Sequence, residues 1–303
     1  MNERPGASQD QAHQWASPDV GGRSLADAGY LADERICSVV HLGDRLGKPV
    51  LVEGPAGTGK TELAKSVAAA TGRRLIRLQC YEGLDEAKAL YEWNYSKQLL
   101  RIQAERAGDE RETADWTGLQ ADIFSEEFLL TRPLLAAIRA PDPVVLLIDE
   151  VDRLDVETEA LLLEVLSDYQ ISIPELGTVT STQTPLVFLT SNNSRDLSEA
   201  LKRRCLYLYI DYPAPEREQA IVLSRVPDLS AALAGQITGV VGSLRRLQLK
   251  NRPSVSETID WARTLSLLGA EEVGTELVIG TLHVLLKHQP DIEKATAEFR
   301  RAR

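Results

Sequence analysis

A glycine-rich segment carries the clearest chemical signal in the sequence. Gly54-Pro55-Ala56-Gly57-Thr58-Gly59-Lys60-Thr61 fits the pattern G-x-x-x-x-G-K-[ST] without a gap, and Glu62 follows it. Glycines let successive backbone N–H groups approach phosphate oxygens, and a helix that follows adds the positive end of its dipole. Lys60 would supply a point charge for the β- and γ-phosphates, and the Thr61 hydroxyl is a ligand for Mg²⁺. We therefore predict that residues 54–62 bind the phosphates of a nucleotide.

Two adjacent carboxylates, Asp149 and Glu150, follow the apolar run 144–148. If this run is a strand of a parallel sheet, both acids lie at the carboxyl edge, where ligands bind. Asp149 would then hold Mg²⁺ together with Thr61, and Glu150 would orient and polarise an attacking water. A solvated acidic turn is the alternative, and the phosphate-binding motif makes that alternative the weaker one.

The elements that must position these residues alternate between apolar strands and helices. This alternation is typical of a parallel sheet covered on both faces. The expected strands are 49–54, 75–80, 144–149, 186–191 and 206–210, and the expected helices are 32–46, 60–72, 86–107, 128–140, 158–169 and 197–203. Residues 108–122 are expected to be a loop, and 170–184 a β-hairpin.

After Pro213 the pattern changes to helices alone. We expect helices at 216–225, 229–249, 254–268, 275–287 and 291–300, with a capping box formed by Ser254 and Glu257. These patterns divide the chain into a flexible arm (1–24), an α/β core (25–212) and an all-helical C-terminal domain (213–303).

Composition excludes several classes of function. The 303 residues include 34 Lys and Arg against 45 Asp and Glu, a net charge of −11, which argues against sequence-independent binding to nucleic acid. No apolar run approaches the roughly 18–20 residues that span a bilayer, and the first residues resemble no secretory signal. Cys37, Cys80 and Cys205 form no CxxC pair, and we expect a cytoplasmic location, no membrane insertion and no zinc site.

The two motifs, with the hairpin and the C-terminal helices, resemble the AAA+ ATPases. This resemblance implies ATP and Mg²⁺ as cofactors, a three-layer αβα P-loop NTPase core with a parallel five-stranded sheet, and an all-helical lid. It also implies a polar residue after a further strand that senses the γ-phosphate. In the segment LTSNN, Asn192 matches this position better than Asn193. An Asx turn is the alternative.

The resemblance further implies an arginine that reaches into the site of a neighbouring subunit. The segment LSEALKRRC ends in two arginines, of which Arg204 matches the position best and Arg203 is the second choice. Such an arginine stabilises charge on the transferred phosphoryl group. The alternative is a pair of cations that stabilises the end of a helix.

A finer resemblance to the MoxR branch of AAA+, in its CoxD-type subgroup, extends from about Tyr30 to Leu268. The stretches YEGLDEAKALYEWNY and IPELGT carry it most specifically. It implies a homo-oligomeric, hexameric ring that remodels a protein client or delivers a metal cofactor, often with a von Willebrand A-domain (VWA) partner. CoxD-type members resemble maturation factors for molybdenum hydroxylases. The expected activity is therefore ATP hydrolysis by a chaperone-like motor.

Two other functions are alternatives to this prediction. A clamp-loader or helicase-like AAA+ protein would need a basic pore, whereas YEGLDEAK and IPELGT are neutral or acidic. A nucleotide-gated scaffold with little turnover is disfavoured by Glu150.

Several roles stay open at this point. The family's second sensor is an arginine in the first turn of a lid helix, and the helix beginning PSVSETIDWA has none there. Gln79 is a candidate hydrogen-bond partner for Glu150, and the segment Gly29–Leu31 is a candidate for contacting the adenine. The candidates for the second sensor are Lys250, Arg252, Arg245 and Arg246, and the candidates for gripping a client are Tyr91, Trp93 and Tyr95.

Overall fold

A five-stranded parallel sheet forms the centre of the computed structural model, which describes residues 15, 17–106 and 122–301. The strand order is β2-β5-β8-β1-β9, and each neighbouring pair is parallel. The strands are β1 (Val50–Glu53), β2 (Arg74–Gln79), β5 (Val144–Asp149), β8 (Leu186–Ser191) and β9 (Leu206–Tyr209). The expected fold class, a parallel sheet in an αβα core, is confirmed.

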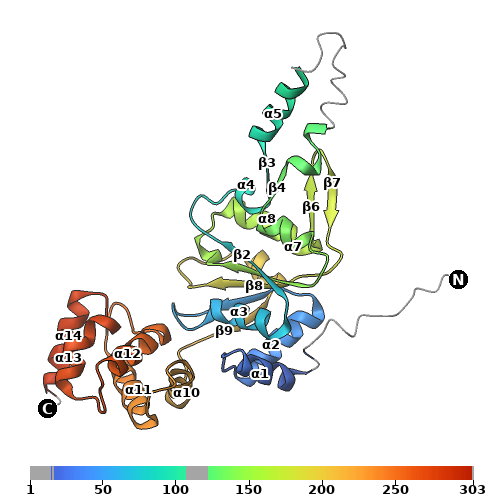
Figure 1. Cartoon of the computed structure of the whole chain (residues 1–303). Helices are drawn as coiled ribbons and strands as arrows, with labels where there is room; N and C mark the ends of the chain where they lie inside the picture. Colours follow the sequence, from blue (N-terminus) through green and yellow to red (C-terminus); the bar gives the residue numbers. More distant parts are fainter. Residues whose placement is uncertain (1–14, 16, 107–121, 302–303) are drawn as a thin grey trace.

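Helices cover both faces of this sheet, as Figure 1 shows. Alternate residues of β5 enter two different cores: Val145 and Leu147 pack with the helices of one face, and Leu146 and Ile148 with those of the other. This double coverage explains why the strand is continuously apolar. The helices are α1 (Pro18–Asp27), α2 (Glu34–Leu46) and α3 (Lys60–Thr71) on one face, and α7 (Pro133–Ile138) and α8 (Val156–Asp168) on the other.

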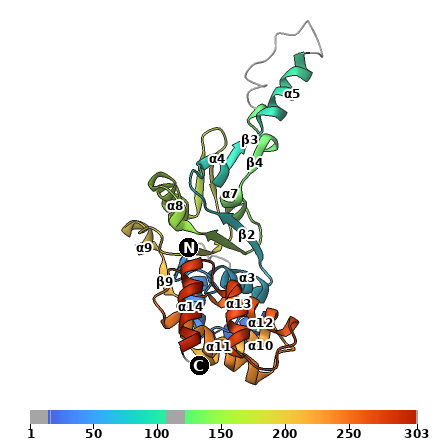
Figure 2. The same cartoon turned by 90° about the vertical axis from the view of Figure 1, so that its left-hand side faces the viewer.

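The C-terminal part of the chain forms a helical bundle beside the sheet (Figures 1 and 2). The fully buried Trp261 lies in its core and donates a hydrogen bond of 2.8 Å to the Thr281 hydroxyl. The expected capping box is present, because Ser254 and Glu257 each accept a hydrogen bond from the backbone N–H of the other. The helices are α10 (Pro215–Arg225), α11 (Ala231–Arg246), α12 (Val255–Leu267), α13 (Thr275–Leu285) and α14 (Gln289–Arg301).

The insertion between β2 and β5 differs from the sequence prediction. The helix expected over 86–107 is interrupted by a strand, and the helix expected over 128–140 begins only at Pro133. The two short strands pair antiparallel, and three-residue strands that pair across a long insertion leave no periodicity in the sequence. The elements are α4 (Glu86–Ala89), β3 (Tyr91–Trp93), α5 (Tyr95–Arg106), the 3₁₀ helix η1 (Glu126–Phe128) and β4 (Leu129–Thr131). Most of the expected loop 108–122 lies outside the described residues.

The three aromatic residues of the insertion have different surroundings. Trp93 is buried and packs edge-on against Phe124, with ring centroids 5.2 Å apart, and Tyr91 packs against Trp93. Tyr95 is 62% exposed on α5, which projects away from the body of the molecule (Figures 1 and 2). Two of the three aromatics therefore serve the packing of the insertion.

The predicted β-hairpin is confirmed. It consists of β6 (Gln170–Ile173) and β7 (Gly177–Thr180), joined by the turn predicted between Pro174 and Gly177. Two short elements complete the core, the 3₁₀ helix η2 (Val151–Arg153) after β5 and α9 (Glu199–Arg204) before β9.

The N-terminal arm predicted over residues 1–24 is too long. Helix α1 begins at Pro18, and the Ser17 side chain caps it by accepting a hydrogen bond from Val20 N–H. Trp15 is buried against this helix, and a Cβ at Gly21 would lie only 2.4 Å from its ring. Gly21 thus makes room for the tryptophan. Residues 1–14 and 16 lie outside the described part of the chain.

None of the helices within residues 17–106 and 122–301 has both the length and the apolar character needed to cross a membrane.

Candidate active site

The glycine-rich loop between β1 and α3 lies against two other parts of the chain. Gly54 has φ of +148°, and a Cβ there would lie 2.0 Å from the carbonyl oxygen of Ile210, just after β9. Gly57 has φ of +70°, and a Cβ there would lie 2.4 Å from the Cβ of Ser254, the N-cap of α12. Only glycine is compatible with these close approaches. The loop is therefore fixed between the core and the helical bundle.

Lys60 begins α3 and points its ammonium group back into the loop. Its Nζ donates hydrogen bonds to the carbonyl oxygens of Gly54 (2.8 Å) and Pro55 (2.7 Å). Burial lowers the pKa of Lys60 to about 8, although Asp152 and Asp149 nearby act in the opposite direction. The side chain is therefore still largely protonated at pH 7 and presents a cation inside the loop.

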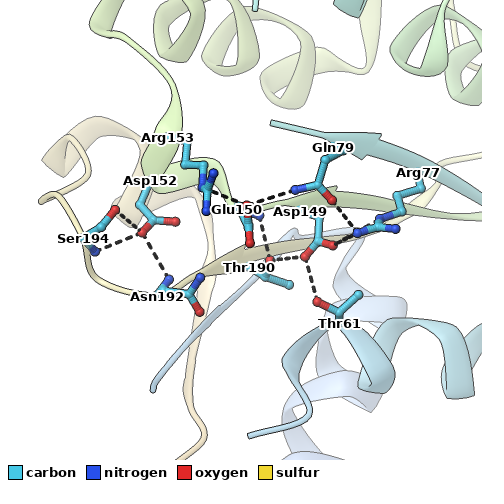
Figure 3. Close-up of polar contacts among 10 residues, drawn as sticks. All are labelled: Thr61, Arg77, Gln79, Asp149, Glu150, Asp152, Arg153, Thr190, Asn192 and Ser194. Atoms are coloured by element: carbon cyan, nitrogen blue, oxygen red, sulfur yellow. Dashed lines mark hydrogen bonds and ion pairs between the residues drawn. The ribbon is translucent and has the colours of Figure 1, made fainter. Parts of the chain in front are cut away.

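Asp149 ends β5 and has hydrogen-bond partners at both carboxylate oxygens (Figure 3). Its Oδ1 accepts from the hydroxyls of Thr61 (2.8 Å) and Thr190 (2.5 Å), and its Oδ2 accepts from Nη2 (2.5 Å) and Nε (3.1 Å) of Arg77. The structure thus brings the predicted pair Thr61 and Asp149 together.

The chemistry of this pair fits a magnesium site. A carboxylate and a hydroxyl are oxygen ligands of the kind that Mg²⁺ prefers, and Mg²⁺ is normally held by one or two carboxylates together with substrate phosphates. Within the described part of the chain, no group of three or more His, Cys, Asp or Glu side chains could hold a metal ion. One carboxylate and one hydroxyl fill only part of an octahedral Mg²⁺ shell, so the donors at Asp149 and Thr61 match a cation whose other ligands are waters and phosphate oxygens.

Glu150 follows directly in a left-handed conformation, with φ of +59°. Its backbone N–H donates to the Thr190 hydroxyl (2.9 Å). Its Oε2 accepts a hydrogen bond from Gln79 Nε2 (3.1 Å) and forms an ion pair with Arg153 (2.8 Å). The contact with Gln79, considered from the sequence, is therefore present. A positive φ at a residue other than glycine is costly and is often found at functional sites.

Asn192 is positioned by Asp152, a residue that the sequence analysis did not select. Asp152 is buried, and its Oδ2 accepts from the backbone N–H of Asn192 (3.3 Å) and from both the N–H (2.9 Å) and the hydroxyl (2.6 Å) of Ser194. Burial acts to raise the pKa of Asp152, but these hydrogen bonds outweigh it and lower the pKa. An acid three residues after Asp149, close to the end of a predicted strand, was the available signal.

One cavity of about 280 Å³ brings most of the predicted residues together, but Gly54, Pro55 and Thr58 of the loop do not line it. Asn192 lines it, whereas Asn193 does not, which separates the two candidates by position. The other predicted residues that line it are Ala56, Gly57, Gly59, Lys60, Thr61, Glu62, Asp149 and Glu150. The arrangement places the ammonium of Lys60, the hydroxyl of Thr61 and the amide of Asn192 around the same space as the carboxylates of Asp149 and Glu150, at the carboxyl edge of the sheet.

A second cavity of about 280 Å³ lies between the core and the helical bundle. Residues 29–31 line it, as the sequence suggested for an adenine site, together with residues 57–59 and side chains of α10 and α12. Tyr30 is buried there, and burial raises the pKa of its hydroxyl. Glu62 lines both cavities and forms an ion pair of 2.8 Å with Arg225 of α10.

Arg203 and Arg204 lie apart from both cavities. They are exposed at the C-terminal end of α9, and neither side chain forms a hydrogen bond or an ion pair with any residue that the structure describes. The structure therefore does not bring them to the site of their own subunit.

The candidates for the second sensor separate into two groups. Arg245 is bound to the buried carboxylate of Glu218 (2.5 and 2.8 Å), which indicates a structural role, and Arg246 donates to Ser243. Lys250 and Arg252 line a third cavity, beside Pro55, Ala56 and Gly57 of the loop. Arg263 of α12, which was not a candidate, lines the cavity next to Tyr30.

Arg77, Arg153 and Thr190 also contact the predicted acids without having been selected from the sequence. Arg77 lies two residues before Gln79 and thus on the same face of β2, which was the available signal. Thr190 lies inside β8, where a polar residue in an apolar run could have been noticed.

Comparison with other proteins gives partial matches. An uncharacterised protein of Staphylococcus haemolyticus is 26% identical over 188 residues, which cover 60% of this chain and 62% of that protein's length. The Lon protease of Nitratidesulfovibrio vulgaris is 46% identical over 74 residues, 22% of this chain and 9% of the protease. The Thermotoga maritima RuvB Holliday junction branch migration motor superposes with a TM-score of 0.48 at 17% identity, covering 93% of this chain and 72% of that one.

The family model of the AAA domain (dynein-related subfamily) matches residues 49–205, from the strand before the glycine-rich loop to the end of α9. This match covers more than half of the chain and includes both motifs around the first cavity. The protein therefore belongs to the AAA domain family, in its dynein-related subfamily.

Proposed function

We propose that this protein is an ATP-hydrolysing motor of the MoxR type that remodels a protein client. One observation carries the catalytic part of the proposal: Lys60, Thr61, Asp149, Glu150 and Asn192 line a single cavity. They come from three segments that are distant in sequence, and each has the chemistry that attack of water on a γ-phosphate requires.

The binding side chains have distinct tasks. Residues 54–61 would surround the phosphates with backbone N–H groups, and the buried ammonium of Lys60 would neutralise the β- and γ-phosphates. Thr61 and Asp149 would hold Mg²⁺, which when bound supplies positive charge against the phosphate oxygens. Residues 29–31 and the second cavity provide room for the base and sugar.

Glu150 would orient the attacking water and accept its proton. Gln79 and Arg153 both contact this carboxylate, through a hydrogen bond of 3.1 Å and an ion pair of 2.8 Å. The Asn192 amide would hydrogen-bond the γ-phosphate or the water, at a place fixed by Asp152.

The arginine that completes the site would come from a neighbouring subunit. Arg204, with Arg203 as the alternative, is exposed on α9, and its side chain forms no hydrogen bond or ion pair with the described residues of its own subunit. A head-to-tail interface that closes into a ring, here a hexamer, would place this arginine at the next subunit's γ-phosphate.

The client part of the proposal rests on the resemblance of the sequence to the CoxD-type subgroup. We propose that the motor acts with a VWA-domain partner in the maturation of an enzyme of the molybdenum hydroxylase type. In support, α5 and the β6–β7 hairpin extend from the side of the core opposite the helical bundle, where they are accessible to a client (Figure 1).

Calorimetry with ATP and an assay of phosphate release test the catalytic part. Lys60→Ala should remove nucleotide binding, and Lys48→Ala, an exposed lysine just before β1 that lines neither cavity, is the matched control. If Lys60→Ala binds ATP with wild-type affinity, the assignment of the glycine-rich loop as the phosphate-binding site is wrong.

A trap variant tests the client part. Glu150→Gln, purified in ATP from its native cell, should retain a VWA-domain protein and a molybdenum hydroxylase that Lys60→Ala does not retain. If neither is enriched, the client assignment is wrong, although ATP hydrolysis would stand.

A further inference from the structure

Arg77 contacts two groups of the site, the carboxylate of Asp149 and the side-chain amide of Gln79. It projects from the edge strand β2, two residues before Gln79, and β2 is in register with β5 so that Gln79 lies opposite Asp149. The guanidinium donates to Asp149 Oδ2 from Nε (3.1 Å) and Nη2 (2.5 Å), and the same Nη2 donates to the amide oxygen of Gln79 (Figure 3).

This contact fixes the direction of the Gln79 amide. A guanidinium has only donors, so the amide atom that faces Arg77 must be the oxygen. The amide nitrogen must then face Glu150, where it donates to Oε2 at 3.1 Å. If the amide were turned around, its oxygen would face the carboxylate of Glu150 and repel it. Arg77 therefore determines that Gln79 holds Glu150.

The same guanidinium also neutralises the carboxylate that would hold the metal. The Arg77 guanidinium and a bound divalent ion would share the Asp149 carboxylate. Because the two positive charges repel, each would weaken the binding of the other to Asp149. Thr61 and Thr190 keep Asp149 in place through Oδ1, so its orientation does not depend on Arg77. Removal of Arg77 would therefore remove a repulsion without releasing the carboxylate.

We propose that Arg77 is a positioning residue that links the metal-holding carboxylate to the base: it weakens divalent-cation binding at Asp149 and holds the Gln79 amide toward Glu150. This inference rests on the proposed function. A cation that takes over Asp149 would loosen Arg77, and thereby Gln79 and the restraint on Glu150. The base would be released only where the metal is bound.

The first effect is measured by binding alone. Calorimetry with a non-hydrolysable ATP analogue, once in Mg²⁺ and once in EDTA, gives two dissociation constants whose ratio reports the contribution of Mg²⁺. In Arg77→Ala this contribution should rise by about tenfold, a value reduced from the full Coulomb energy because Arg77 is partly exposed. Arg77→Lys, which keeps the charge, and Arg74→Ala on the same strand should stay within about twofold of wild type.

The second effect is measured by a double-mutant cycle. Gln79→Ala should change kcat but not KM in the wild-type background. In Arg77→Lys, the single ammonium group cannot bind both Asp149 and the Gln79 amide oxygen as the forked guanidinium does. In that background, Gln79→Ala should therefore have no further effect on kcat.

The outcomes separate this inference from the proposed function. If the wild-type protein does not bind the analogue in either condition, both fall. Two results with a protein that binds the analogue would show that the inference on Arg77 is wrong while the proposed function stands. The first is an unchanged or lower Mg²⁺ contribution in Arg77→Ala, and the second is additivity of Gln79→Ala and Arg77→Lys in their effect on kcat. Arg77 lies on an edge strand and is 46% exposed, and Arg77→Met, of similar length, replaces Arg77→Ala if thermal unfolding shows a loss of fold.

Discussion

The carboxyl edge of the sheet and the end of α9 are organised in opposite ways. At the sheet edge, Asp149 and Glu150 each have several hydrogen-bond or ion-pair partners within the chain. At the end of α9, Arg203 and Arg204 are exposed and have no partner among the described residues. Both places are assigned to the same reaction in the proposed function.

This difference separates side chains that work within one subunit from those that work between subunits. A group that acts in its own subunit can be positioned during folding by its neighbours, which reduces the cost of reaching the reactive geometry. A group that acts on a neighbouring subunit must remain accessible until assembly. The predictions below test whether the two places behave as this division requires.

The largest expected effect is that of Arg204→Ala. ATP should bind about normally, while hydrolysis should fall by about 10³–10⁵-fold, the range of an arginine supplied across an interface. Mixing this variant with Lys60→Ala should restore part of the activity, since one subunit still has a working arginine and the other a working loop. If light scattering confirms rings and no mixing ratio restores hydrolysis, the action between subunits is wrong, and Arg203 is tested next.

Glu150→Gln comes second. The amide cannot accept the proton of the attacking water, and turnover should fall by about 10²–10⁴-fold while nucleotide affinity is kept. In contrast to Arg204→Ala, no mixture with Lys60→Ala should recover activity, since the Glu150→Gln subunit would lack its base and the other subunit its nucleotide. Steady-state hydrolysis near the wild-type rate would show that another group is the base.

A smaller effect is expected from the anchor of α9. The buried carboxylate of Glu159 in α8 accepts from Ser198 N–H (2.7 Å) and from Arg195 (2.8 Å), just before α9 begins. Arg195→Ala should shift the helix that carries Arg204 and lower hydrolysis by up to about 10²-fold at unchanged ATP affinity. Arg300→Ala, an exposed arginine of the last helix, is the control. A wild-type rate for Arg195→Ala would show that the placement of Arg204 does not depend on this anchor.

The smallest effect concerns pH. Because burial lowers the pKa of Lys60 to about 8, the side chain loses its proton as the pH rises through that value. Affinity for the nucleotide should be constant below pH 8 and then fall by up to about tenfold per pH unit. Lys60→Arg keeps its charge and should show no such fall between pH 7.5 and 9.5. If calorimetry gives the same dependence of nucleotide affinity on pH for the wild type and Lys60→Arg, the protonation of Lys60 does not control nucleotide binding.

The sequence predicted those parts of the fold that depend on local pattern. All five strands of the sheet, the hairpin and the capping box of Ser254 follow from periodicity and from turn and capping residues. The strands β3 and β4 were missed because each is only three residues long and gains its partner from a distant segment. Helix α1 was missed because residues 1–24 are polar, rich in Gly, Ser and Asp and without helical periodicity, whereas in the fold Gly21 accommodates Trp15.

The candidate site shows the same limit. The loop and the two carboxylates could be predicted because each motif is contiguous. The spacing of Arg77 from Gln79 and of Asp152 from Asp149 marked both as neighbours of the site. Their contacts could not be predicted, because these depend on the register between β2 and β5 and on the turn that η2 makes toward the end of β8. Residues that hold other residues have no motif of their own.

The cavity beside Tyr30 has a consequence for folding. Its walls come from residues 29–31, the loop after β1, the segment after β9 and helices α10 and α12, so no single part of the chain can form it. A ligand that fills it binds only the fully folded protein and stabilises that state by RT ln(1 + [L]/Kd), about 2.7 kcal/mol at a concentration one hundred times Kd. Such a ligand would therefore join the two halves of the chain into one cooperative unfolding unit.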